Sequence, residues 1–333
     1  NLKGRSLLNL KDFSSEEINY LLELAIFLKE KKLKGSCDKL LLGKNIVLIF
    51  EKTSTRTRCA FEVAAFDEGA HVTNLTNSQM GEKESIEDTA KVLGRFYDGI
   101  QFRGYKQETV ELLSKYSKVP VWNGLTDMYH PTQVLSDFMT IKEQIHKPLK
   151  DIKFVYMGDG RNNVAHSLMI GAAKMGMTYI GVSPKALYPE DDLLDELRKI
   201  AGENEGSITI THEVDEAIIN ADVVYTDIWA SMGEEDCIEE RIKLLLPYQI
   251  NMDIIRKTNN PDVLFLHCLP SFHDLNTAFA QKVYDQFGIK EMEVTDEVFK
   301  SHYSKVFDEA ENRMHTIKSV MCATLSDSEN LIS

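Results

Sequence analysis

Short apolar runs rich in β-branched residues alternate along the chain with segments whose apolar positions recur at helical spacing. Because helical patterns separate the runs, the sequence indicates parallel sheets flanked by helices, which is an α/β fold. The runs that predict strands are Asn45 to Phe50, Ala70 to Leu75, Gly99 to Arg103, Val119 to Trp122, Lys153 to Met157, Thr178 to Val182, Ile208 to Thr211, Val223 to Asp227 and Leu264 to Leu266.

Two helices are predicted near the ends of the chain. Ser14 and Glu17 form the pattern of a capping box, followed by apolar residues at helical spacing. A second amphipathic segment runs from about Asp308 to Leu325. We expect this C-terminal helix to pack back on the first part of the chain.

A polar stretch from His146 to Asp151 interrupts the alternation of strands and helices. The chain has 333 residues, enough for two domains of about 150 residues each. We therefore predict one domain over residues 1–150 and another over residues 151–310, each a mainly parallel sheet flanked by helices. Residues 311–333 would form the C-terminal helix.

Composition narrows the classes of partner. The chain has 38 Lys and Arg against 52 Asp and Glu, a formal net charge of −14, which argues against nucleic acid or anionic lipid as the main partner. Its five cysteines are scattered and show no C-x-x-C spacing, so neither a disulfide framework nor a zinc site is indicated. No apolar run is long enough to span a membrane, and no signal-peptide pattern is present. The expected location is the cytoplasm.

The strongest chemical signal in the first half is the segment from Ser54 to Arg58, which lies between a predicted strand and a predicted helix. Hydroxyl groups, guanidinium groups and the free N–H groups of a helix N-terminus together favour phosphate binding, although the pattern is not a Gly-rich Walker loop. The alternative is an exposed helix cap with surface arginines. Arg103 and His130 also follow predicted strands, at the sheet edge where open α/β folds bind ligands.

The second half carries weaker signals. Gly158 and Gly160 follow a strand as in a dinucleotide-binding turn, but Asn163 replaces the third glycine, so NAD binding is poorly supported. Asp227 ends a predicted strand, where its carboxylate could hold an amine. Cys268 follows another strand, and a thiol there is either functional or simply structural.

Five motifs spread over both halves occur together. They are STRTR at Ser54 to Arg58, FRG at Phe102 to Gly104, HPTQ at His130 to Gln133, DxxxSMG at Asp227 to Gly233 and HCLP at His267 to Pro270. On these residues the chain closely resembles the aspartate/ornithine carbamoyltransferase family over nearly its whole length. The SMG loop with HCLP is typical of the ornithine branch of that family.

The resemblance implies transfer of the carbamoyl group of carbamoyl phosphate to the δ-amine of L-ornithine, giving L-citrulline and phosphate. The reaction would serve arginine biosynthesis or the arginine deiminase pathway, in a cleft between the two domains. The implied catalytic residues are Cys268, Asp227, Arg103 and His130. The implied carbamoyl phosphate ligands are Ser54, Thr55, Arg56, Thr57, Gln79 from a neighbouring subunit, Arg103, His130, Gln133, Cys268, Leu269 and Arg313. The implied ornithine ligands are Asn163, Asp227, Ser231 and Met232. No cofactor and no metal is expected, and the assembly would be a homotrimer or a multiple of trimers.

Some residues depart from the family pattern, and other functions stay open. Glu82 stands where His or Lys is common and removes positive charge near the phosphate site, and His166 and Ser271 are smaller departures.

A putrescine carbamoyltransferase would lack the SMG loop. An aspartate carbamoyltransferase would need a basic pocket where this chain has Ser231 and Met232. A nucleotide-dependent dehydrogenase would leave STRTR and HPTQ without a role.

Overall fold

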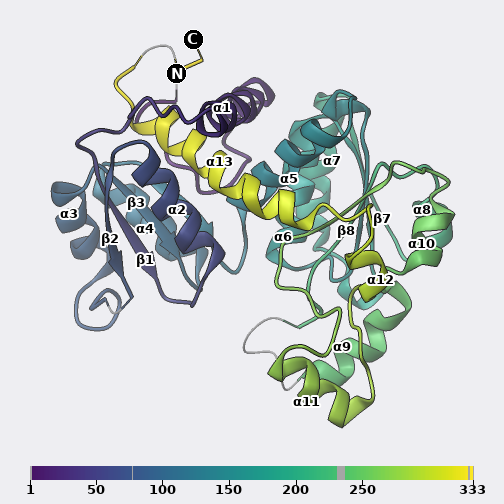
Figure 1. Cartoon of the computed structure of the whole chain (residues 1–333). Helices are drawn as coiled ribbons and strands as arrows, with labels where there is room; N and C mark the ends of the chain where they lie inside the picture. The colour runs from purple at the N-terminus through teal and green to yellow at the C-terminus, as the bar shows by residue number, and fades with distance from the viewer. Residues whose placement is uncertain (1, 77, 231–236, 329–330, 333) are drawn as a thin grey trace. The chain divides into compact units, whose positions relative to one another are not determined.

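The structure is a computed structural model that describes residues 2–76, 78–230, 237–328 and 331–332 (Figure 1). The chain forms two compact units. One consists of Asn1–Met139 with Ala310–Ser333, and the other of Thr140–Glu309. The predicted α/β organisation with two mainly parallel sheets is confirmed.

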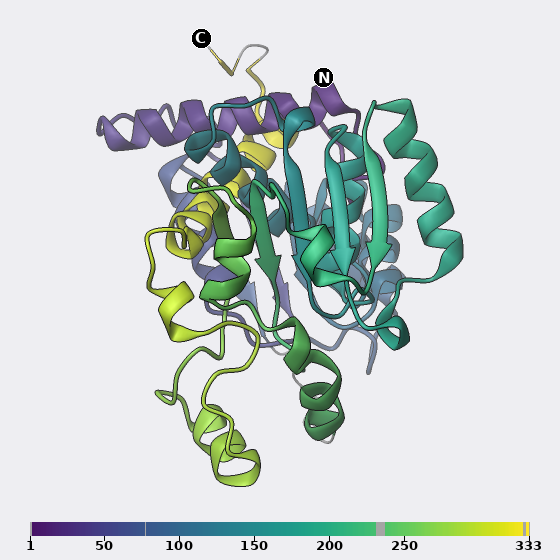
Figure 2. The same ribbon diagram turned by 90° about the vertical axis from the view of Figure 1, so that its right-hand side faces the viewer.

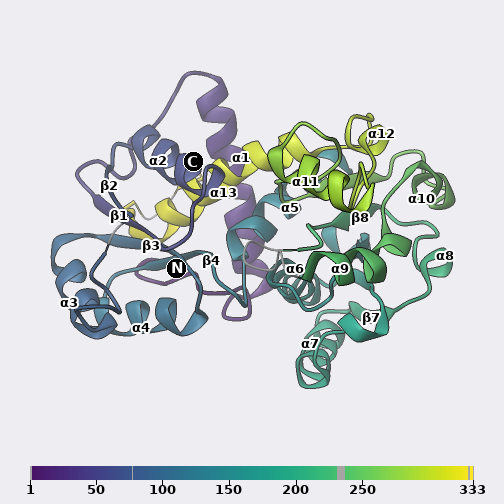
Figure 3. The same ribbon diagram turned by 90° about the horizontal axis from the view of Figure 1, so that it is seen from below.

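The first unit is built on a four-stranded parallel sheet of order β2-β1-β3-β4. Helices α3 and α4 pack against each other on one face of this sheet, and α2 and α13 cover the other face (Figure 3). Strand β1 is buried on both sides, as expected for a parallel strand between two helical layers. The elements are α1 (Ser15–Leu33), β1 (Asn45–Phe50), α2 (Arg56–Asp67), β2 (His71–Leu75), α3 (Ile86–Phe96), β3 (Gly99–Arg103), α4 (Gln107–Ser117), β4 (Val121–Leu125), α5 (Pro131–Gln144) and α13 (Val306–Leu325).

The second unit is built on a five-stranded parallel sheet of order β7-β6-β5-β8-β9, whose arrows run in one direction in Figure 2. Helices α6 and α7 pack together beside β6 and β7, while apolar residues of α10 and α12 share a core with β5 and β8. The elements are β5 (Lys153–Met157), α6 (Asn163–Lys174), β6 (Thr178–Val182), α7 (Asp191–Glu203), β7 (Ser207–Thr211), α8 (Val214–Ala217), β8 (Val223–Thr226), α9 (Ile238–Leu245), α10 (Met252–Lys257), β9 (Leu264–His267), α11 (Ala278–Phe287) and α12 (Asp296–Phe299).

The terminal helices are anchored within the first unit. Ser14 and Glu17 form the capping box of α1. On α13, the Ser319 hydroxyl donates to the carbonyl of Leu21 (2.6 Å), and buried Lys318 forms an ion pair with Asp67 (2.7 Å). Most of α13 therefore belongs to the first unit, although it follows the second unit in the chain.

The division between these compact units falls inside α5, after Met139, and the domain boundary near Lys150 stays a prediction from the polar stretch. Helix α5 continues without a break to Gln144, so its last turn groups with the second unit. In the described part of the chain, no helix combines the length and apolar character needed to cross a membrane.

Candidate active site

In each sheet, two neighbouring strands continue into connections that leave in opposite directions. In the first unit these strands are β1 and β3, and in the second unit they are β5 and β8. Ligands of open α/β folds bind beyond the carboxyl ends of such strands. The predicted site residues after β1, β3, β5 and β8 therefore occupy the two favoured ligand positions of the fold.

The STRTR segment follows β1 and opens α2, which begins at Arg56. The Thr55 side chain makes no capping hydrogen bond, whereas the N–H of Thr57 donates to the Ser54 hydroxyl (3.3 Å). A helix N-terminus carries partial positive charge from its N–H groups. The turn thus presents backbone and side-chain donors together, which suits an anion.

Thr57 joins three distant parts of the first unit. Its buried hydroxyl accepts hydrogen bonds from the guanidinium groups of Arg103 (3.1 Å) and Arg313 (2.8 Å). Arg103 ends β3, and Arg313 lies on α13. We refer to Thr57, Arg103, His130 and Arg313 as the Thr57 cluster. The sequence predicted all four as site residues, and the structure brings them to one place.

Two glycines shape the backbone around this cluster. Opposite the step from Phe102 to Arg103, β4 has one extra residue, and such a bulge redirects the neighbouring side chain. That residue is Gly124, where a Cβ atom would lie 2.4 Å from Nε2 of Gln101. A Cβ atom on Gly104 would lie 2.2 Å from the Glu51 carboxylate, which explains the glycine of the FRG motif.

His130 is a neutral histidine in cationic surroundings. Burial lowers its pKa well below the usual value, and the charges of Arg313, Arg103 and Arg56 lower it further. At neutral pH the ring therefore carries one N–H donor and no charge. The ring lies directly before Pro131, the first residue of α5.

The predicted carbamoyl phosphate ligands outside the cluster lie in different settings. Gln133 is buried in the first turn of α5. Gln79 is exposed, and its backbone carbonyl accepts from the N–H groups of Glu82, Lys83 and Glu84 in a tight turn. Leu269 belongs to the second unit and has a left-handed backbone, with φ of 54°.

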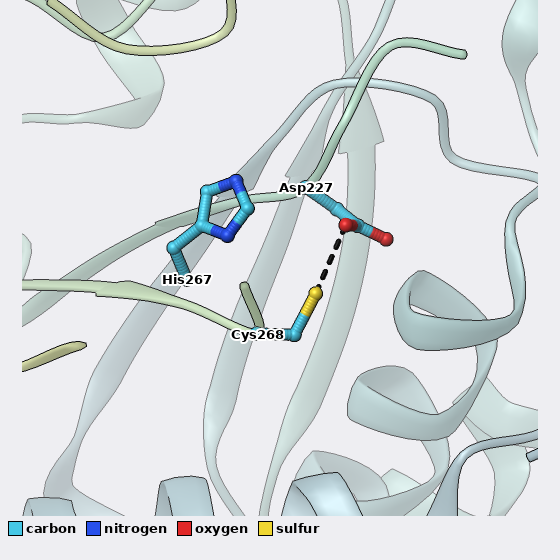
Figure 4. A group of neighbouring side chains, drawn as sticks. All are labelled: Asp227, His267 and Cys268. Atoms are coloured by element: carbon cyan, nitrogen blue, oxygen red, sulfur yellow. Dashed lines mark hydrogen bonds between the residues drawn. The ribbon is translucent and has the colours of Figure 1, made fainter. Parts of the chain in front are cut away.

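Asp227 and Cys268 meet at the carboxyl ends of the adjacent strands β8 and β9 (Figure 4). The thiol of Cys268 donates to Oδ1 of Asp227 at 2.9 Å. The same oxygen accepts from the N–H of Ile228 (2.8 Å). Burial nevertheless raises the pKa of Asp227, because the hydrogen bonds from Cys268 and Ile228 only partly offset the loss of solvent. This Asp227–Cys268 pair provides a carboxylate with enhanced basicity.

His267 fixes the loop that carries Cys268. Its Nδ1 accepts the N–H of Leu269 (2.9 Å), so the ring proton is on Nε2, which donates to the buried carboxylate of Glu293 (3.2 Å). The backbone N–H of His267 donates to Glu309, which is also buried (2.9 Å). Sequence reasoning missed both glutamates. The available signal was an acidic residue between apolar neighbours, as at Met292-Glu293-Val294.

Asn162, which the sequence did not single out, lies beside Asp227. Its side-chain oxygen caps α6 by accepting from Ala165 N–H, and its amide group donates to Asp227 (3.3 Å). Asn163 is the first residue of α6. The predicted ornithine ligands Ser231 and Met232 lie outside the described residues.

Asp227, His267 and Cys268 offer atoms within 4.8 Å of one another, which is a possible arrangement of metal ligands. Both ring nitrogens of His267 are, however, already hydrogen-bonded to protein groups. A second group of His273, Asp274 and Asp296 is tied into an ion pair with Lys300. In both groups, candidate ligand atoms therefore already contact other protein groups.

Comparison with known families covers both units. A family model described as "Aspartate/ornithine carbamoyltransferase, carbamoyl-P binding domain" matches residues 5–143. The model described as "Aspartate/ornithine carbamoyltransferase, Asp/Orn binding domain" matches residues 150–324.

Individual relatives match along their whole length. The catabolic ornithine carbamoyltransferase of Bacillus licheniformis is 61% identical over 329 residues, covering 98% of each chain. That of Clostridium perfringens is 60% identical over 325 residues, covering 97% of this chain and 98% of the relative. Among solved structures, the ornithine carbamoyltransferase of Pyrococcus furiosus is 42% identical with a TM-score of 0.89, covering 98% of this chain and 99% of that one.

Proposed function

The chain belongs to the aspartate/ornithine carbamoyltransferase family, and on that premise we propose how its residues carry out the reaction. It is an enzyme that transfers the carbamoyl group of carbamoyl phosphate to the δ-amine of L-ornithine, giving L-citrulline and phosphate. The first unit takes carbamoyl phosphate and the second takes ornithine. The two substrates must meet, and we expect them to do so in the interdomain cleft predicted from the sequence.

The phosphate dianion is held at the start of α2. The hydroxyls of Ser54 and Thr55, the guanidinium of Arg56 and the N–H groups of the helix N-terminus surround it. These groups create a local positive site in a chain whose net charge is −14. The carbamoyl end points towards Thr57, Arg103 and His130, while Gln133, the carbonyl of Leu269 and Arg313 orient it.

Negative charge develops on the carbamoyl oxygen when the amine attacks. Donors placed in advance around that oxygen stabilise the transition state. Thr57, Arg103 and His130 supply these donors. A neutral His130 contributes a hydrogen bond without adding a further positive charge beside the arginines.

The δ-amine must lose its proton before it can attack, because an alkylamine is protonated at neutral pH. Asp227 accepts this proton, and its raised pKa makes it a better acceptor than an exposed carboxylate. The thiol of Cys268 orients Asp227 and the amine, with no covalent intermediate on sulfur. Asn163, Ser231 and Met232 hold the α-amino and α-carboxylate groups of ornithine.

The observation that carries this assignment is the separation of chemistry between the units. The first unit gathers arginines around Thr57, and the second holds the Asp227–Cys268 pair. Citrulline formation, measured with ornithine, putrescine, lysine and aspartate in competition, tests the acceptor. We expect ornithine to dominate; preference for putrescine would reassign the enzyme within the family, and no carbamoyl transfer to any amine would refute the function.

The direction of the reaction is proposed as catabolic, because the relatives with about 60% identity bear that name. The enzyme would then form ornithine and carbamoyl phosphate from citrulline and phosphate. Ornithine release should continue steadily when carbamoyl phosphate is removed by phosphoryl transfer to ADP. Release that stops after one turnover would contradict this direction.

Assembly and location are proposed on separate grounds. A homotrimer, or a multiple of trimers, lets Gln79 of one subunit reach the phosphate bound by its neighbour, which agrees with its exposed turn. The five free cysteines support a reducing cytoplasm as the working compartment. Sedimentation of the native protein tests the proposed trimer, and cell fractionation tests the proposed cytoplasmic location.

A further inference from the structure

Gln133 is paired with a buried carboxylate one turn further along α5. Its amide nitrogen Nε2 donates to Oδ1 of Asp137 at 2.8 Å. Both side chains are almost fully buried, with 1% of Gln133 and none of Asp137 exposed. Nothing in the family assignment gives Asp137 a role.

The pairing fixes which way the Gln133 amide faces. An amide has a donor end and an acceptor end of nearly equal size, whereas a carboxylate only accepts hydrogen bonds. An oxygen of Gln133 could not lie 2.8 Å from an Asp137 oxygen without repulsion. The NH₂ end of Gln133 is therefore held towards Asp137, and its carbonyl end faces away from it.

This orientation suits the NH₂ group of carbamoyl phosphate, which the donors of Thr57, Arg103 and Arg313 cannot bind. The arginines and Thr57 offer donors, which suit the carbonyl oxygen and the phosphate. The carbamoyl NH₂ group is itself a donor and needs acceptors. If the Gln133 amide were turned around, its NH₂ group would face the NH₂ group of the substrate, and neither group could accept a hydrogen bond.

We propose that Asp137 is a positioning residue that selects carbamoyl phosphate over acyl phosphates of the same shape, by holding the carbonyl of Gln133 towards the substrate NH₂. This inference rests on the proposed role of Gln133 in binding the carbamoyl group. Loss of the Asp137 carboxylate should therefore reduce the preference for a ligand with an NH₂ group over one with a methyl group, and should change phosphate binding little.

Two stable ligands isolate the NH₂ group. Phosphonoacetamide has a methylene in place of the bridging oxygen of carbamoyl phosphate, and 2-oxopropylphosphonate has in addition a methyl in place of NH₂. Calorimetric titration gives the ratio of their dissociation constants. Effects on the phosphonate cancel in this ratio, because both ligands carry it.

The variant Asp137→Leu, which keeps the branched shape and removes the acceptor oxygens, should lower the preference for the amide ligand about tenfold, because the Gln133 amide then loses the buried hydrogen bond that fixes its direction. Its affinity for 2-oxopropylphosphonate should stay near that of the wild type. Ser136→Ala is the matched control, because Ser136 is equally buried on α5 and donates to the backbone carbonyl of Gln133. That control should keep the wild-type ratio.

Three further variants separate the ways in which the proposal can fail. Gln133→Leu tests the underlying role: an unchanged ratio would refute carbamoyl binding by Gln133, and the Asp137 proposal with it. If Gln133→Leu loses the preference and Asp137→Leu keeps it, the role of Gln133 stands and that of Asp137 is overturned. The exchange Gln133→Glu with Asp137→Asn reverses the pair, with a donor at 137 and an acceptor at 133. It should recover the preference that Gln133→Glu alone loses, and failure to recover it would contradict the proposal.

Discussion

At Asp227, burial disfavours the charged folded state and, in the proposed mechanism, favours acceptance of a proton from the amine. The carboxylate accepts hydrogen bonds from Cys268, Ile228 and Asn162, yet its pKa is raised because burial outweighs them. An acid with a higher pKa in the folded state than in the unfolded state binds its proton more tightly when folded. Its contribution to stability therefore falls as pH rises through the unfolded value towards the folded one.

Replacement of Asp227 by Asn removes the charge and keeps the size. We expect kcat/KM for ornithine to fall on the order of a hundred- to a thousand-fold, as for loss of a general base. The difference in melting temperature, variant minus wild type, should increase between pH 4 and pH 7, because only the wild type acquires the buried charge. Melting curves across this pH range check the slope, and a decreasing difference would show that the charge stabilises the fold.

Cys268 is expected to assist by position. Cys268→Ser keeps a donor to Asp227, so turnover should be reduced but easily measurable. Mass spectrometry of the enzyme during steady turnover gives an independent check. A carbamoylated Cys268 on the reaction path would contradict the proposed mechanism.

At the scale of elements, the sequence predicted the strands well where local pattern decides them. Asn45 to Phe50, Gly99 to Arg103 and Lys153 to Met157 match β1, β3 and β5 residue for residue. The strand expected at Val119 begins instead at Val121, because Pro120 has no N–H for the ladder. It continues to Leu125, because buried Asn123 finds partners in Leu8 and Gln107, which are distant in sequence.

The site was predictable where motifs carried it and not where tertiary contacts did. Thr57, Arg103, His130 and Arg313 were all expected and do converge. Glu293 accepts a hydrogen bond from His267, which lies 26 residues away in the sequence. An isolated glutamate gives no periodic signal that would predict this contact. The division of the compact units inside α5 likewise gives no sequence signal, since a continuous helix carries no linker composition.

Helix α13 should depend on its buried lysine. Lys318 is fully buried and pairs with Asp67 (2.7 Å) and Glu68 (3.6 Å) at the end of α2. Removal of one partner of a buried ion pair costs about 3 kcal/mol, so Lys318→Ala should destabilise the first unit. Lys91→Ala, which breaks an exposed pair with Glu87, is the control and should leave the midpoint unchanged.

Each unit has its own fluorescent reporter for this experiment. Trp122 is buried in the first unit and Trp229 in the second. Urea unfolding in Trp229→Phe and Trp122→Phe backgrounds follows the units separately. We expect Lys318→Ala to lower the urea midpoint reported by Trp122 and to leave the midpoint reported by Trp229 unchanged. An equal decrease in both midpoints would show that α13 stabilises both units together.

At the scale of the whole molecule, the proposed trimer makes activity depend on neighbouring subunits. An inactive Arg56→Ala chain and an inactive Gln79→Lys chain can be dissociated together and allowed to reassemble. If Gln79 acts in trans, a site is complete when its own chain carries only the Gln79 change and its neighbour only the Arg56 change. Random assembly gives this in about a quarter of sites, so about a quarter of wild-type activity should return. No recovery in demonstrably mixed assemblies would overturn the shared site.

The assignment of carbamoyl phosphate to the first unit and of ornithine to the second is tested most directly by titrating phosphonoacetamide into wild type, Arg56→Ala and Asp227→Asn. We expect Asp227→Asn to bind this carbamoyl phosphate analogue as the wild type does, because Asp227 lies in the second unit and Arg56 in the first. Arg56→Ala should weaken binding on the order of tenfold to a hundredfold, as expected for loss of a charged hydrogen-bond donor to the phosphonate. Equal losses in the two variants would contradict the account, since they would show that the two ligand sites are not separate.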